Sequence, residues 1–82
     1  MGSVFIIQGL LIYVYAFDHN PPHIHAKYNE FEGIFNIETG VMTRGNLPKN
    51  AKHLVKEFIS QYRDRLLSMW KNQDFEELKF KE

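Results

Sequence analysis

The sequence predicts an α+β protein in which an antiparallel sheet of four to five strands packs against one long α-helix. Runs of β-branched and aromatic residues, separated by turn signals, fill the first half of the chain. Apolar residues at helical spacing fill most of the second half. The chain has 82 residues, of which 44% are hydrophobic and 15% aromatic, so we expect one folded domain over residues 1–82.

The first two strands are predicted at residues 4–7 and 10–17, on either side of a Gln8-Gly9 turn. The second run has almost no polar residue, which indicates a strand inside the sheet rather than at its edge. The segment 18–22 then ends this strand, because Pro21 and Pro22 lack backbone donors and favour an extended connection.

A second hairpin is predicted around Asn29-Glu30, where a two-residue turn pairs positions whose numbers sum to 59. A longer loop would shift the register by one residue and exchange the two faces of the hairpin. The two-residue turn places Ile24, Ala26 and Tyr28 opposite Phe35, Gly33 and Phe31 on an apolar face, and His23, His25 and Lys27 opposite Asn36, Ile34 and Glu32 on the other face.

A short fifth strand is predicted at residues 41–44, before Gly45-Asn46 ends it. The helix follows, with Asn46 or Leu47 as its cap, Pro48 in its first turn and its end near Trp70 or Lys71. Its apolar face comprises Ala51, Leu54, Val55, Phe58, Tyr62, Leu66 and Met69. Beyond the helix, residues 75–80 predict either a short C-terminal edge strand or a frayed tail.

Composition excludes several classes of protein. The chain has no cysteine, so it is neither a disulfide-stapled secreted domain nor a thiolate zinc ribbon. Ten basic and ten acidic side chains give a net charge of zero, so no global positive field attracts nucleic acid or membranes. The longest apolar stretch, 10–17, is about half of a membrane span, and the residues before it show no charged n-region with a small-residue cleavage site. We therefore expect a cytoplasmic protein that does not bind membranes.

Three of the four histidines lie close together in the segment 18–25. Because His23 and His25 are two residues apart on a strand, both imidazoles point to the same face. With His19 and Asp18 they form a candidate divalent-metal site that suits zinc or manganese. The alternative is a purely structural corner, in which the histidines face solvent and Asp18 caps a turn.

The same segment also suits acid–base chemistry without a metal. A histidine among His19, His23 and His25 could act as general base, with Lys27 stabilising a phosphate, as in small ribonucleases. The alternative for Lys27 is a surface ion pair with Glu32, its neighbour across the strands.

The outward-facing side of the helix carries a basic stripe. Cations in the first two turns oppose the helix dipole, so helix stability does not account for them. An acidic partner or phosphate groups would account for them, whereas the ordinary alternative is a solvated helix face. No aromatic residues are interleaved, so nucleic-acid binding is only weakly supported. The stripe consists of Lys49, Lys52, His53, Lys56 and Arg63.

The segment 18–26, read with Gly45, Leu47-Pro48, Leu54-Val55 and Trp70, resembles the bacterial domain-of-unknown-function family four-one-six-zero (DUF4160). The likeness covers nearly the whole chain. The resemblance implies no established activity and no assigned catalytic residues. Members are often encoded beside a second short protein, which implies a toxin-antitoxin-like gene pair and a protein partner encoded nearby.

Two functional hypotheses follow from these observations. The first is a small interaction protein, one component of a toxin-antitoxin-like pair, that binds its partner through the histidine face, a sheet edge or the basic stripe. The alternative is a metal-dependent or histidine-based phosphodiester hydrolase, acting on RNA through His19, His23 and His25.

Overall fold

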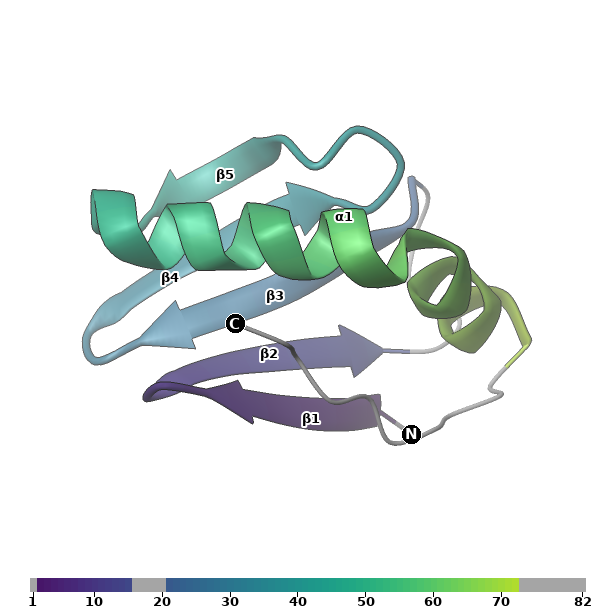
Figure 1. Ribbon diagram of the computed structural model, residues 1–82, viewed down its shortest axis with the longest axis horizontal. Helices are drawn as coiled ribbons and strands as arrows, with labels where there is room; N and C mark the ends of the chain where they lie inside the picture. The colour runs from purple at the N-terminus through teal and green to yellow at the C-terminus, as the bar shows by residue number, and fades with distance from the viewer. Residues whose placement is uncertain (1, 16–20, 73–82) are drawn as a thin grey trace.

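The computed structural model describes residues 2–15 and 21–72, which form one sheet and one helix (Figure 1). The sheet has five antiparallel strands in the order in which they follow along the chain, and the helix lies across one face of it. This is the α+β architecture that the sequence predicts. The elements are β1 (Gly2–Ile7), β2 (Leu10–Tyr15), β3 (His23–Tyr28), β4 (Phe31–Asn36), β5 (Met42–Asn46) and α1 (Lys49–Asn72).

The two predicted hairpins are present with their predicted turns. Gln8 and Gly9 both have positive φ, at 49° and 82°, as the twist of a two-residue hairpin requires. In the second hairpin Asn29 takes the positive φ, 53°. The β3–β4 register pairs His25 with Ile34 and Lys27 with Glu32, so the predicted faces are confirmed and the one-residue shift does not occur.

β5 differs from the prediction, since it runs through Gly45-Asn46 instead of ending before them. Two features of the backbone explain this. Thr43 is an extra residue between the pairs Ile34–Arg44 and Phe35–Met42, which makes a β-bulge. Gly45, at a φ of 90°, lies so close to β4 that a Cβ atom there would overlap the Glu32 carbonyl oxygen. Glycine therefore continues the strand where any other residue would break it.

α1 covers β2 and β3 and closes a single core. The helix begins after Pro48, whose carbonyl oxygen accepts a hydrogen bond from the Lys52 amide at 2.9 Å. The backbone leaves helical geometry at Tyr62, where α1 bends. Leu54 and Tyr62 of the predicted apolar face are only half-buried, and Ile59 is fully buried in addition. The buried side chains of α1 are Ala51, Val55, Phe58, Ile59, Leu66, Met69 and Trp70.

Two predictions fall outside the described residues, namely the C-terminal strand at 75–80 and the corner at 18–20. In the part of the chain that the structure describes, no helix is long and apolar enough to cross a membrane.

Candidate functional site

Within residues 2–15 and 21–72, one face of the sheet carries no helix; we call it the outer face, and it is the far side of the sheet in Figure 1. Successive residues of a strand point to opposite faces, and Ile24 and Ala26 of β3 are completely buried on the helix side. His23, His25 and Lys27 therefore point to the outer face. None of the three is buried.

The structure places the His23 and His25 imidazoles together, with ring centroids 5.2 Å apart and the planes inclined at 61°. His23 is held by a hydrogen bond from Nδ1 to the Pro21 carbonyl oxygen at 2.8 Å. A carbonyl oxygen only accepts, so Nδ1 carries the proton and, in the neutral ring, Nε2 is the unprotonated nitrogen. This is the nitrogen that a general base or a metal ligand uses.

Pro21 and Pro22, which precede β3 in the chain, are hydrogen-bonded to other parts of the structure. The Ile37 amide donates to the Pro22 carbonyl oxygen at 3.0 Å, so the strand ends of β3 and β4 are joined there. The carbonyl oxygens of Pro21 and Pro22 thus both accept hydrogen bonds. His23 consequently projects from an anchored backbone.

Two of the four predicted metal ligands, His23 and His25, lie among the described residues. Zinc in proteins takes four ligands, so two histidines alone do not complete a zinc site. Among the described residues no group of three or more His, Cys, Asp or Glu side chains gathers at one point. Asp18 and His19, the other two predicted ligands, lie outside the described residues.

The outer face carries an apolar surface that sequence reasoning did not single out. Ile6 of β1 is 72% exposed, the largest exposure of any large hydrophobic side chain that the structure describes. Its cross-strand neighbour is Leu11 of β2. The adjacent row of paired residues on this face comprises Tyr13 of β2, His25 of β3 and Ile34 of β4. All four of these side chains are half-buried. The alternation of residues in β1 and β2 contains this information, but the residues can be assigned to a face of the sheet only once the β1–β2 register is known.

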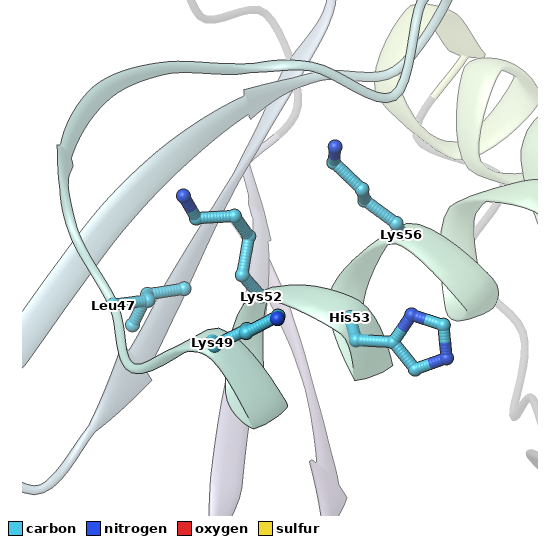
Figure 2. Close-up of a pocket in the computed structure, with 5 residues that line it drawn as sticks. All are labelled: Leu47, Lys49, Lys52, His53 and Lys56. Carbon is cyan, nitrogen blue, oxygen red and sulfur yellow. The ribbon is translucent and has the colours of Figure 1, made fainter.

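The basic stripe of α1 lies on the opposite side of the sheet from His23 and His25, because α1 packs on the other face. Four of its members line a hollow of about 550 Å³ together with Leu47: Lys49, Lys52, His53 and Lys56. Figure 2 shows the side chains of Lys52 and Lys56 extending from α1 in the same direction. An adjoining hollow of about 390 Å³ is lined by Gln8, Lys49, Asn50, His53 and Leu54.

Arg63, the fifth predicted member of the stripe, does not line either hollow. Its Nε donates to the Ile37 carbonyl oxygen at 3.1 Å, and the side chain is partly buried. His53 is engaged too, since its Nε2 lies 2.8 Å from Glu57 Oε1 one turn along the helix. Helical spacing put these side chains on one stripe, but it carried no information about the loop that Arg63 contacts.

Comparison with protein families gives one match over residues 9–71, to a family described as "Domain of unknown function (DUF4160)". No curated protein and no solved structure matches the chain. The matched region includes β3 with its histidines and nearly all of α1.

Proposed function

Since the chain belongs to the DUF4160 family, whose description assigns no activity, we propose its function from its surfaces: it binds a protein partner through the outer face, as one component of a toxin-antitoxin-like pair. One observation carries the proposal. Ile6, at 72% exposed, continues into Leu11, Tyr13 and Ile34 on a face that α1 does not cover. Contiguous exposed apolar side chains mark interaction surfaces.

The size and charge of the outer face describe the partner. Six-residue strands at about 3.3 Å per residue and strand spacings near 4.8 Å give a face of roughly 20 Å by 20 Å. A standard interface takes about 800 Å² from each protein, so we expect the partner to cover the whole face and reach an edge strand. Lys27 and Arg44 outnumber Glu32 there, so the partner should surround its apolar centre with acidic residues.

The test is co-purification of the full chain with the product of the neighbouring gene. Ile6→Lys places a charge among the apolar side chains of the interface and should abolish co-purification, because a buried unpaired charge is strongly unfavourable. Val41→Lys is the matched control, since Val41 is also β-branched and exposed, at 52%, but precedes β5. Both variants should unfold at the same urea concentration as the parent. Equal loss in both, or no loss with Ile6→Lys, would contradict the proposal.

A second function is favoured by one observation, the hydrogen bond that leaves Nε2 of neutral His23 unprotonated. We propose, as the alternative, histidine-based cleavage of RNA. In this reaction one imidazole removes the proton of a ribose 2′-hydroxyl, whose oxygen attacks the adjacent phosphorus. The 5′-oxygen leaves with a proton from a second imidazole, which gives a 2′,3′-cyclic phosphate. Lys27, on the same face, would stabilise the charge on the phosphate oxygens.

Cleavage of a short RNA, with detection of the cyclic phosphate end, tests this alternative. Replacement of both His23 and His25 by Ala should abolish cleavage while the circular dichroism spectrum is unchanged. His53→Ala, on the helix side of the molecule, is the control and should cleave at the parent rate. Cleavage by a folded double variant would exclude these two histidines as the catalytic groups.

A further inference from the structure

The start of α1 concentrates positive charge in a molecule whose net charge is zero. α1 contains six basic residues and only two acidic ones. Three of the basic residues, Lys49, Lys52 and Lys56, line the 550 Å³ hollow with His53 and Leu47, and no Asp or Glu is among its lining residues. We call this hollow, together with the adjoining one at Gln8 and Asn50, the basic groove.

Successive lysines of the basic groove are about one helical turn apart. At 1.5 Å per residue, Lys52 lies about 4.5 Å along the helix axis from Lys49, and Lys56 about 6 Å beyond Lys52. Lys52 and Lys56 extend in the same direction, whereas Lys49 extends towards the side on which His53 lies (Figure 2). Gathering like charges at the positive end of a helix opposes folding, so the arrangement is not explained by the stability of α1.

The residues that line the groove indicate whether its lysines bind an acidic protein segment or a nucleic acid. Leu47 lines the hollow but is only 4% exposed, so the apolar surface open to a ligand includes Leu54, which is half-buried in the adjoining hollow. The lysine stems add further apolar surface. Among its described lining residues the groove has no Phe, Tyr or Trp on which a base could stack, so His53 is its one ring, and it has no arginine to grip a phosphate with two parallel hydrogen bonds. These features favour a protein segment over nucleic acid.

From these observations we infer that the basic groove binds an acidic segment of a partner protein, with carboxylates paired to Lys49, Lys52 and Lys56 and an apolar side chain packed against Leu54 and the lysine stems. The inference deepens the proposed function and rests on it in one respect, namely that the segment belongs to the partner that covers the outer face. The groove and the outer face lie on opposite sides of the sheet, so each surface is tested by its own variants.

The experiment measures fluorescence anisotropy of a labelled synthetic peptide in which Glu and Asp flank two central Leu residues, titrated with the full-length chain. We expect saturable binding that weakens as salt is raised. A peptide with Gln and Asn in place of the acids should not bind. The double variant Lys52→Gln with Lys56→Gln should bind the acidic peptide at least tenfold more weakly.

The matched control removes the same charge from the other side of the molecule. Lys27→Gln with Arg44→Gln lowers the net charge equally but alters the outer face, so peptide affinity should stay within about twofold of the parent. Equal weakening in both double variants would show a non-specific charge effect and overturn the inference. Tighter binding of a duplex RNA or DNA probe, lost in the groove variant alone, would overturn it in favour of a nucleic-acid site.

Failure of this inference is distinguishable from failure of the proposed function. If the acidic peptide does not bind while the partner still co-purifies in an Ile6-dependent manner, the inference about the groove is wrong and the outer-face proposal stands. If the peptide binds through the lysines and no partner co-purifies, the outer-face proposal alone is wrong. Ile6→Lys should leave peptide affinity unchanged, which shows that the two readouts are separate.

Discussion

Arg63 of α1 donates its Nε proton to the carbonyl oxygen of Ile37, just beyond β4, over 3.1 Å. The amide of Ile37 in turn donates to the Pro22 carbonyl oxygen at 3.0 Å, at the entrance to β3. One residue therefore connects the helix to the corner from which His23 projects. The side chain of Ile37 is completely buried, which fixes the position of both hydrogen bonds.

Replacing Arg63 should therefore destabilise the fold. Arg63→Ala is expected to lower the free energy of unfolding by about 1–2 kcal/mol, because it leaves a partly buried carbonyl oxygen without its charged donor. Urea denaturation followed by Trp70 fluorescence measures the change. Arg63→Lys separates charge from geometry, since lysine keeps the charge but lacks the Nε–H group. We expect a similar loss; full stability of Arg63→Lys would show that charge alone is responsible.

Gly45 should tolerate no side chain. Its φ is 90°, and a Cβ atom there would overlap the Glu32 carbonyl oxygen and lie 2.9 Å from the Cα atom of Gly33. Because both neighbours belong to the backbone of β4, they yield only by breaking the β4–β5 pairing. We expect Gly45→Ala to lower the free energy of unfolding by about 2–4 kcal/mol.

The control for this variant is Gly40→Ala. Gly40 also has a positive φ, 75°, but a Cβ atom there would meet only the Arg63 Nη2 atom, at an ordinary 3.7 Å. The loss should then be about 1–2 kcal/mol, from the backbone conformation alone. Thermal unfolding of the two variants side by side gives the comparison, and equal losses would mean that the close approach of β5 to β4 does not matter.

Trp70 is buried, yet its Nε1–H group has no hydrogen-bond acceptor within the described structure. An unsatisfied buried donor is unfavourable by about 1–3 kcal/mol, so removing it offsets part of the loss of packing. Trp70→Phe should therefore change the free energy of unfolding by less than about 1 kcal/mol, whereas Trp70→Leu, which also lacks the aromatic ring, should lower it by about 2–3 kcal/mol. Urea denaturation followed by circular dichroism measures both, and equal losses would contradict the argument.

The sequence was sufficient for the features that depend on local periodicity. Pairing across Asn29-Glu30 gave every β3–β4 partner, and the helical period placed α1 over the apolar faces of the strands. It failed where two distant segments meet. From the sequence alone, Gly45 is interpreted as the end of a strand. The feature that requires glycine there, its close approach to Glu32, accompanies a β-bulge in the β4–β5 pairing that the sequence does not reveal. Arg63 looked like one more exposed cation because its acceptor, Ile37, is 26 residues away.

The candidate site follows the same rule. Strand alternation placed His23 and His25 on one face, and the structure confirms that their rings are in contact. The hydrogen bond that orients His23 could not be predicted from the sequence, because it depends on the direction of the Pro21 carbonyl group. The outer apolar surface also required the β1–β2 register, since Ile6 reads from the sequence as one more residue of a hydrophobic run.

His23 and His53 should carry the proton of the neutral imidazole on different ring nitrogens. In neutral His23 the proton belongs on Nδ1, which faces the Pro21 carbonyl oxygen, whereas in neutral His53 it belongs on Nε2, which lies 2.8 Å from Glu57 Oε1. Long-range proton–nitrogen correlation spectra of the neutral imidazoles distinguish the two tautomers directly.

Variants give this prediction its control. Glu57→Gln retains a side-chain oxygen that can accept from His53, so the Nε2–H tautomer should persist, while Glu57→Ala should let His53 return to the mixture of tautomers that a solvated imidazole adopts. Neither change should affect His23, on the other side of the sheet. If His23 proves to be protonated on Nε2 in the parent protein, the Pro21 hydrogen bond is absent in solution, and the assignment of Nε2 as the basic nitrogen fails with it.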